Sequence, residues 1–595
     1  MNEFTLGEDK RKTSELYALL KRRGFFWPSY EIYGGVAGFF DLGHLGSLLR
    51  ENVERLWKER FVIQEDFLLV DTPSITPEIA FKWSGHLEKF SDNLTRCLNC
   101  SAPFRADHLL EGIVENPDSL KMEELGEALD AQGIKCPVCG GEIGPPEEFN
   151  LMFRTFIGPG GERPGYLRPE TAQSIFMDFA LLYRMNRERM PFGVAQIGKG
   201  FRNEISPRQG MMRQREFHMA EGEFFFDPEE RTFKPFERYR NLSVNLVPKG
   251  SSGETLGITL GSAVEKGLIC SEVLAHFMGV TYGFAADVGI PGENMRFRQH
   301  TETEMAHYAR DCWDLEVETS YGWIEMVGIA DRSAYDLRQH MKGSGQSLTA
   351  ARRFAEPEKR NVTIVEVDQK VLGPIFRGDS RELADIIRGM DPDHLSAIKD
   401  NGPPLEIEYS KGKASIPPEA VSIRVEERTV SGEDYIPHIV EPSFGIDRLM
   451  VALLEHAYFE SDRSPMKEEV DAEQGPYRVL KLRTRVAPIK CGVFPLMNKD
   501  ELPEIAGRIL AECKKAGLTT YYDHSGSIGR RYARMDEIGT PFSITVDYDS
   551  KVDLCATIRF RDTGEQVRTP IEGIEEIILD LVSGKRTFDK LGPVI

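Results

Sequence analysis

A strand–loop–strand segment at residues 191–227 constrains the fold of this 595-residue chain most strongly. The sequence PFGVAQIGKGFRNE leads through the polar stretch ISPRQGMMRQR and returns as EFHMAEGEFFF. Because side chains alternate between the two faces of a strand, the returning segment carries four of them on one face: Phe217, Met219, Glu221 and Glu223. Two glutamates on one face with Phe and Met are unusual for a purely hydrophobic sheet. The pattern predicts an antiparallel sheet with a polar site on one face.

Composition and charge exclude several classes of protein. Hydrophobic residues make up 41% and charged residues 28%, which excludes collagen-like, low-complexity and wholly disordered chains. No apolar stretch approaches the roughly 20 residues of a membrane helix, and the first residues lack the apolar run of a secretory signal. We therefore expect a cytoplasmic protein without a membrane partner.

The distribution of charge singles out the C-terminal fifth of the chain. The net charge of −21 argues against nucleic-acid binding over the whole surface. From Arg485 onward, however, 16 basic residues nearly balance 17 acidic ones. This last part is therefore the best suited to approach a polyanion.

Further patterns predict the order of the elements around this sheet. Residues 42–60 place Leu45, Leu48, Leu49, Val53, Leu56 and Trp57 at helical spacing, which predicts an amphipathic core helix. Residues 310–340 are typical of strand, turn, strand and helix. Residues 341–430 are rich in Lys, Glu, Gly and Pro, with short alternating strands, and we interpret them as an insertion.

Two later segments complete this outline. Residues 441–458 predict a strand, a turn and a helix, with Asp447 and Arg448 in the first helical turn. From Arg485 the predicted order is strand, helix, strand, helix, strand, strand, helix, which suits a small α/β domain.

Four of the nine cysteines form two CxxC pairs, Cys97 with Cys100 and Cys136 with Cys139. In a reducing compartment, paired CxxC turns are typical of metal ligands, and four thiolates can surround Zn²⁺ at about 2.3 Å each. The 35 residues between the pairs exceed the usual spacing, and they include a helix-like stretch, SLKMEELGEALDAQG. The alternatives are disulfides or four unrelated buried cysteines. We expect a structural zinc site, because four thiolates leave no open position.

Arginines and acids near predicted strand ends suggest phosphate and metal chemistry. Arginine binds phosphate oxygens with two parallel hydrogen bonds, and the arginines of these segments are Arg202, Arg208, Arg213, Arg215 and Arg448. Carboxylates can bind Mg²⁺ or an ammonium group, and those near Gly- or Pro-marked turns are Glu170, Glu204, Glu221, Glu223, Glu325 and Glu441. Taken singly, each arginine also fits a surface salt bridge and each acid a solvated side chain.

A resemblance to a known family takes the interpretation further. The segment FRNEISPRQGMMRQREFHMAEGEFFF resembles motif 2 of the class II aminoacyl-tRNA synthetases, GIDRLMVALLEHAY resembles motif 3, and residues 34–62 resemble motif 1. Within that class, YLRPETAQ, YGWIEMVGIADRSAYDL and EPSFGIDR resemble the glycyl-tRNA synthetases of the archaeal and eukaryotic dimeric type. The resemblance implies a six- or seven-stranded antiparallel catalytic sheet and an α/β anticodon-binding domain after Arg485.

The resemblance also implies roles for individual residues in glycine activation. The ATP-binding set would be Arg202, Asn203, Glu204, Arg213, Gln214, Phe217, Glu325, Met326 and Arg448. Of these, Arg202, Arg448 and Glu325 would be catalytic, and Glu325 would act through Mg²⁺. The residues around glycine would be Glu170, Glu221, Glu441, Pro442 and Ser443.

A basic, aromatic segment of the last domain is the candidate tRNA contact. Residues 521–542 place Arg530, Arg531 and Arg534 beside tyrosines, which can contact unpaired bases. The alternative is an ordinary basic helix over a hydrophobic core.

Together these expectations describe a homodimeric ligase of the class II synthetase fold that joins glycine to tRNA(Gly) with ATP, with formation of diadenosine tetraphosphate as a side activity. The expected parts are a catalytic domain in three segments (1–90, 150–340 and 431–484), a zinc-binding insertion (91–149), a second insertion (341–430) and an anticodon-binding domain (485–595). Two alternatives remain: an inactive synthetase-like protein that binds nucleic acid, and a class II synthetase for another small amino acid.

Overall fold

The computed structural model describes residues 3–114, 117, 120–207, 209–251, 253–302, 304–306, 308–390, 395, 404–461 and 476–595. Of residues 3–10 and Val362, only the backbone is described. Arg208, one of the arginines noted in the motif 2 loop, lies outside the described residues, as does part of the expected 341–430 insertion. The chain forms two compact units, one of Met1–Leu348 with Ile436–Ile595 and one of Thr349–Tyr435.

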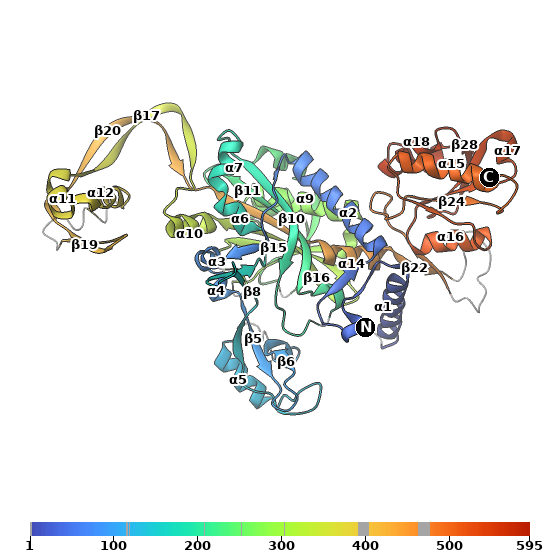
Figure 1. Cartoon of the computed structure of the whole chain (residues 1–595), viewed down its shortest axis with the longest axis horizontal. Helices are drawn as coiled ribbons and strands as arrows, with labels where there is room; N and C mark the ends of the chain where they lie inside the picture. The colour runs from blue at the N-terminus through green and yellow to red at the C-terminus, as the bar shows by residue number, and fades with distance from the viewer. Residues whose placement is uncertain are drawn as a thin grey trace. The chain divides into compact units, whose positions relative to one another are not determined.

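A mixed sheet, with nine strands among the described residues, forms the centre of the first unit (Figure 1). In spatial order its strands are β13 (Leu256–Thr259), β12 (Ser243–Val247), β14 (Met295–Gln299), β15 (Asp311–Thr319), β16 (Gly322–Ser333), β21 (His438–Gly445), β11 (Glu216–Phe226), β10 (Phe192–Phe201) and β3 (Leu68–Leu69). The six strands from β14 to β10 are antiparallel, whereas β12 and β3 run parallel to their neighbours β14 and β10. The expected antiparallel sheet of six or seven strands is therefore present, with six strands, as the middle of a wider, mixed one.

The two faces of β11 differ as its alternation predicts. Ala220, Phe224 and Phe226 belong to the main hydrophobic core. The opposite face carries Met219, Glu221, Glu223 and Phe225, all buried. The two glutamates are therefore buried inside the protein on the face away from that core.

Three helices pack on the core face of the sheet: α2 (His44–Lys58), α9 (Glu272–Val288) and α14 (Ile446–Ala457). The stripe predicted for α2 is confirmed, since Leu45, Leu49, Val53, Leu56 and Trp57 are buried and Leu48 is partly buried against the same core. Helix α14 begins directly after β21, so the predicted turn is absent, but Asp447 and Arg448 occupy the first helical turn as expected.

Further helices and strands complete this unit. The helices are α1 (Glu3–Arg23), α3 (Glu78–Ser84), α4 (His86–Lys89), α6 (Ala172–Met177), α7 (Phe179–Met185), α8 (Leu260–Glu265) and α10 (Tyr335–Ser344). The strands are β1 (Phe26–Pro28), β2 (Phe40–Leu42), β4 (Ile75–Pro77), β8 (Arg154–Ile157), β9 (Arg163–Leu167), β22 (Tyr458–Ser461) and β23 (Tyr477–Leu480). None of the described helices has the length and apolar character needed to cross a membrane.

The region of the two CxxC pairs forms its own small sheet and helix. Strands β5 (Ser91–Arg96), β6 (Pro103–Arg105) and β7 (Glu147–Asn150) pair in the order β6-β5-β7. Helix α5 (Met122–Ala131) confirms the helix predicted between the pairs and buries Leu125 and Leu129 against Ala106 and Leu110.

The C-terminal part is an α/β arrangement around a five-stranded sheet, with the order β25-β24-β26-β27-β28 among the described strands. Its strands are β24 (Cys491–Pro495), β25 (Thr520–Tyr522), β26 (Phe542–Val546), β27 (Cys555–Phe560) and β28 (Gln566–Pro570), and its helices are α15 (Leu502–Lys515), α16 (Ile528–Glu537), α17 (Ser550–Asp553) and α18 (Ile574–Ser583). The sequence outline missed one strand: three, not two, lie between α16 and α18. The short β28 is mostly polar, so its hydrophobic signal is weak.

The second unit is a long two-stranded ribbon with a small core at one end (Figure 1). Its elements are β17 (Ala350–Val367), β20 (Val421–Tyr435), α11 (Gln369–Phe376), α12 (Ser380–Arg388), β18 (Leu405–Tyr409) and β19 (Gly412–Ile416). The sequence suggested only short strands here. The observed strands are longer, and exposed side chains of opposite charge pair diagonally across them, as in Lys359 with Glu427 and Arg424 with Glu366.

Candidate active site

A cleft open to solvent lies where β11, β16 and β21 meet the start of α14. Its lining contains eight of the nine residues expected to bind ATP: Arg202, Glu204, Arg213, Gln214, Phe217, Glu325, Met326 and Arg448. Residues more than 240 positions apart in the chain therefore converge on one space. The ninth, Asn203, is not among the lining residues; its backbone N–H donates to the Leu151 carbonyl at 2.6 Å.

Arg448 is held in position by backbone and side-chain acceptors. Its Nε donates to the Met212 carbonyl at 2.9 Å, and one terminal nitrogen lies 3.0 Å from the Glu325 carbonyl and 3.2 Å from Glu325 Oε2. Burial alone would raise the pKa of Glu325, but the positive charges of Arg448 and Arg202 lower it below its ordinary value. An ionised carboxylate and a guanidinium thus stand side by side in the cleft.

A second arginine and an aromatic ring form the neighbouring wall. The Arg202 guanidinium lies 5.4 Å from the centre of the Phe217 ring, which places a cation beside an aromatic face. Arg213 lies 3.7 Å from the Glu204 carboxylate. This wall can accept a planar ring and an anion next to each other.

Asp447 is a site residue whose role the sequence interpretation missed. Its Oδ2 accepts hydrogen bonds from the backbone N–H of His218 at 2.8 Å and from Gln214 Nε2 at 3.2 Å. The Gln214 amide is therefore buried and bonded to protein, which makes Gln214 a support of the cleft wall. The sequence did indicate a special position for Asp447, since it places an acidic side chain in the first turn of a predicted helix.

A set of buried acids lies beside the cleft, on the same face of the sheet. Glu221 Oε2 accepts from the backbone N–H of Thr171 at 2.6 Å and from its hydroxyl at 2.5 Å, and Oε1 accepts from the Ser443 hydroxyl at 2.7 Å. Ser443 and Glu221 are directly paired across β11 and β21. Ser443 also lines the cleft, so it joins the acidic pocket to the arginine-lined space.

Pro442, expected to contact glycine, has its side chain on the other face of the sheet, so only its backbone is available for such a contact. Alternation along β21 puts Glu441 and Ser443 on the pocket face and Pro442 on the opposite face. That face is shared with Phe444, which packs in the hydrophobic core.

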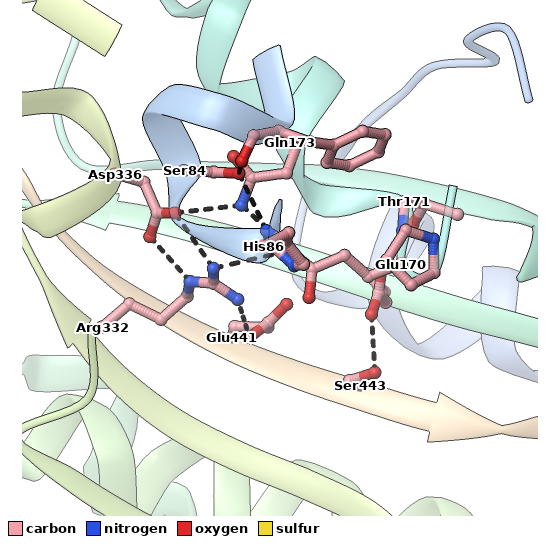
Figure 2. A network of polar contacts seen from close by, with 12 residues as sticks. Ser84, His86, Glu170, Thr171, Gln173, Arg332, Asp336, Glu441 and Ser443 are labelled. Atoms are coloured by element: carbon pink, nitrogen blue, oxygen red, sulfur yellow. Dashed lines mark hydrogen bonds and ion pairs between the residues drawn. The ribbon is translucent and has the colours of Figure 1, made fainter. Parts of the chain in front are cut away.

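Arg332 connects the acids of this pocket, as Figure 2 shows. Its guanidinium is completely buried and donates to Glu441 Oε2 at 2.7 Å and to both oxygens of Asp336 at 2.9 and 3.0 Å. It also lies 3.5 Å from Glu170 Oε1.

Two further side chains contact the same acids. Gln173 Nε2 donates to Glu170 and to Asp336 at 2.9 Å each, and His86 Nε2 lies 3.5 Å from Glu170 (Figure 2).

Arg332, Asp336, Gln173, Thr171 and His86 were not assigned to the site from the sequence. Arg332 and Asp336 are four residues apart with opposite charges in the segment YGWIEMVGIADRSAYDL. Oppositely charged side chains at this spacing often pair, so an interaction between Arg332 and Asp336 could have been predicted from the sequence.

The protonation of the acids differs with their partners. Burial raises the pKa of Glu441 to about 8, against the opposing charge of Arg332. Burial also raises the pKa of Glu221. Burial has the same tendency at Glu170, but Arg332 and His86 outweigh it and lower that pKa strongly. The pocket is acidic and largely closed, which suits a small cation.

Comparison with known proteins identifies the family. The family model "Anticodon binding domain" matches residues 490–581, and "tRNA synthetase class II core domain (G, H, P, S and T)" matches residues 159–242. The glycine–tRNA ligase of Methanothrix thermoacetophila is 46% identical over 577 residues, covering 96% of this chain and 98% of that protein. The chain belongs to the glycine–tRNA ligase family.

Two more relatives in this family show the same full-length similarity. The glycine–tRNA ligase of Methanococcus vannielii is 43% identical, covering 95% of this chain and 99% of that protein. That of Methanocaldococcus jannaschii is 42% identical, covering 94% and 97%. The class II synthetase fold and the C-terminal anticodon-binding domain implied by the sequence motifs are thereby confirmed.

The four CxxC cysteines also come together. Their sulfur atoms all lie within 4.8 Å of one another, with 3.5 Å between Cys97 and Cys139 and 3.7 Å between Cys100 and Cys136. All nine cysteines are free thiols, which removes the disulfide alternative. A side chain at Gly141 would place its Cβ 3.3 Å from the sulfurs of Cys97 and Cys139 and 2.8 Å from Asn99 Cβ, so this turn needs glycine.

The three arginines of α16 differ, and the prediction that Arg531 contacts tRNA is wrong. Arg531 is buried and donates to the backbone carbonyls of Pro495, Leu496 and Gly526. The charged end of Arg531 thus supports the turn before α16. Arg534 forms an ion pair with Asp523 but stays partly exposed, and Arg530 is exposed.

Replacing Arg531 by alanine is expected to destabilise the C-terminal domain. Three carbonyl groups lose a charged donor, and one such hydrogen bond contributes about 1.5–3 kcal/mol. Thermal unfolding followed by circular dichroism should show a melting temperature several degrees lower for Arg531→Ala. The control is Arg530→Ala, which should melt within about one degree of the wild type because a single surface change costs little. Equal melting of both variants would contradict the structural role of Arg531.

Proposed function

We propose that this chain activates glycine with ATP and transfers it to the 3′ end of tRNA(Gly). The observation that carries the proposal is the position of Ser443, which lines the arginine-rich cleft and also donates to Glu221 of the acidic pocket. An amino acid whose ammonium group lies among the acids would have its carboxylate directed to the cleft. The family relationship supports the same assignment.

In the first step the carboxylate of glycine attacks the α-phosphate of ATP, and pyrophosphate leaves. The step depends on alignment and on neutralising negative charge more than on a strong base. We propose that Arg202 contacts the α-phosphate, that Arg213 and Arg448 bind the outer phosphates, and that Phe217 stacks on adenine. Glu204 would accept from the adenine amino group.

A magnesium ion would fit beside Arg448. The Glu325 carboxylate, whose pKa is lowered by Arg448 and Arg202 despite its burial, offers the oxygen ligand that Mg²⁺ prefers. When bound, the ion would neutralise charge on the phosphates. Met326, completely buried beneath the cleft, would close the ATP site from below.

Recognition of glycine would rest on its ammonium group. We propose that Glu170, Glu221 and Glu441 surround that group and that Ser443 lies next to the substrate. Glycine has no side chain to bind, so selectivity against alanine requires protein atoms where a methyl group would lie.

We propose that the four CxxC cysteines bind one structural zinc ion. Four sulfurs at about 2.3 Å from a tetrahedral zinc lie about 3.8 Å apart, close to the 3.5 and 3.7 Å found for two of their pairs. Backbone N–H groups of Asn99 and Cys100 point to Cys97 Sγ, and that of Val138 points to Cys136 Sγ, at 3.4–3.5 Å. Such donors stabilise thiolates, which supports residues 91–149 as a zinc-binding insertion.

We also propose a cytoplasmic homodimer. Four large apolar side chains ahead of α2, at and just before the start of the region that resembles motif 1, are exposed in the single chain: Tyr30, Ile32, Tyr33 and Val36. A contiguous exposed apolar segment of this kind is typical of a contact with another chain. In the C-terminal domain, the exposed Arg530 and partly exposed Arg534 remain candidates for contact with tRNA.

Loss of Arg448 should abolish most of the first step. Arg448→Ala is expected to reduce glycine-dependent ATP–pyrophosphate exchange by at least about a hundredfold, the loss seen when a transition-state charge partner is removed. Arg586→Ala, which changes an exposed arginine of the C-terminal domain, serves as the control and should keep wild-type exchange. Near-normal exchange by a correctly folded Arg448→Ala variant would mean that the phosphates bind elsewhere.

Metal analysis tests the cysteine site. Protein purified without chelators should contain about one zinc per chain, and Cys136→Ser should lose it because a tetrahedral site needs all four ligands. Cys270→Ser, which changes a cysteine far along the chain from the two pairs, should retain the metal. Wild-type protein without zinc would overturn the assignment.

A further inference from the structure

Glu223 is a buried glutamate on the pocket face that is not among the residues proposed to bind glycine or ATP. Its side chain is completely buried, and among the described residues neither of its oxygens has a hydrogen-bond partner. It lies two residues beyond Glu221 on β11, and Glu441 lies two residues before Ser443 on β21. Because Glu221 pairs with Ser443, Glu223 and Glu441 are neighbours across the two strands. One carboxylate oxygen from each of Glu221, Glu223 and Glu441 lies within 4.8 Å of the other two.

The charges around Glu223 do not balance if every acid is ionised. Five buried or nearly buried carboxylates form this group: Glu170, Glu221, Glu223, Glu441 and Asp336. The cationic groups near them among the described residues are Arg332, Arg168, whose charge acts on Glu221, and, when protonated, His86. Even with a substrate ammonium added, the group would keep an excess of buried negative charge. Burial of uncompensated charge is costly enough that such a group binds protons instead.

The hydrogen bonds indicate which acid binds the proton. Glu221 accepts from Thr171 and Ser443, and Glu441 accepts from Arg332. Glu170 and Asp336 both accept from Gln173 and lie close to Arg332. Each of these four carboxylates therefore has a donor that stabilises its anion. Glu223 has none, so its anion is the least stable of the five.

We propose that Glu223 is a positioning residue that stays protonated at neutral pH and donates a hydrogen bond to Glu441. The Glu441 carboxylate is then held between two donors, Glu223 on one side and Arg332 on the other. These donors, together with the substrate's ammonium group, oppose the burial that raises the pKa of Glu441 to about 8, and so favour its anion when the substrate is bound. Consistent with this geometry, burial and the negative charge of Glu441 raise the pKa of Glu223 well above its ordinary value. This inference depends on the proposed function, because it assumes that the acidic pocket binds the ammonium group of glycine.

Infrared spectroscopy tests the proton directly and needs no substrate. At neutral pH the wild type should show the carbonyl stretching band of a protonated carboxylic acid, and Glu223→Gln should lose it. Glu230→Gln, which changes an exposed glutamate just after β11, should keep the band. Absence of the band from the wild type, or its persistence at full strength in Glu223→Gln, would overturn the proposal.

The pH dependence of stability gives a second readout that a merely space-filling role would not change. A raised folded-state pKa stabilises the folded protein fully below the unfolded value near 4.5 and less as the pH rises toward the folded value. Glutamine has no such dependence. The melting temperature of Glu223→Gln, measured relative to the wild type, should therefore increase between about pH 5 and pH 8. A constant difference would contradict the proposal.

Kinetics then connect Glu223 to Glu441 and the substrate. Glu223→Ala removes the donor and should raise the KM for glycine in pyrophosphate exchange by about tenfold or more. Glu223→Gln keeps an N–H donor and should restore most of that loss, whereas equal KM values for the two variants would contradict the donor role. If the wild type fails to activate glycine but shows the infrared band, the proposed function is wrong, whereas the proposal that Glu223 is protonated is still supported.

Discussion

The buried guanidinium of Arg332 is the interaction on which the acidic pocket depends. It has ion pairs with Glu170, Asp336 and Glu441, which come from a loop, a helix and a strand that are remote in sequence. Without a cation at this point, three carboxylates would face one another in a medium of low dielectric constant. Removing one partner of a buried ion pair costs far more than forming the pair gains, so Arg332 determines whether these elements can pack together.

The arginine-lined cleft depends on a different constraint, the junction of β21 and α14. Because the helix begins directly after the strand, Ser443 on the strand and Arg448 in the first helical turn lie within a few residues of each other. Asp447 fixes the junction to the neighbouring strand β11 through the backbone of His218. This short segment therefore fixes the distance between Ser443 of the acidic pocket and Arg448, which is proposed to bind phosphate.

Much of the fold could be predicted from local patterns, and the site only in part. The period-2 pattern of β11 and the helical stripe of α2 predict their buried faces correctly, because both arise from alternation between core and non-core environments. Nothing local shows that Arg531 turns inward to backbone carbonyls, since an arginine among tyrosines suits a core support and a surface contact equally. Arg332 was missed for a related reason: its importance comes from partners brought together only by the tertiary fold.

The motifs were the stronger guide to the cleft, since eight of the nine residues expected to bind ATP line a single space. They were a weaker guide to the acidic pocket, where the Pro442 side chain lies on the core face and Glu223 lies outside the set expected to bind glycine. Motif positions transfer best where one short segment carries the contacts. They transfer less well where the site consists of charges that compensate one another across several strands.

The central claim is that an acidic pocket joined to an arginine-lined cleft selects glycine for activation. The most direct measurement is ATP–pyrophosphate exchange by the full-length chain with each of the twenty amino acids in turn. Exchange is expected with glycine and at most a weak background with alanine, serine, threonine and proline. Exchange supported by another amino acid in preference to glycine, or by none, would contradict it.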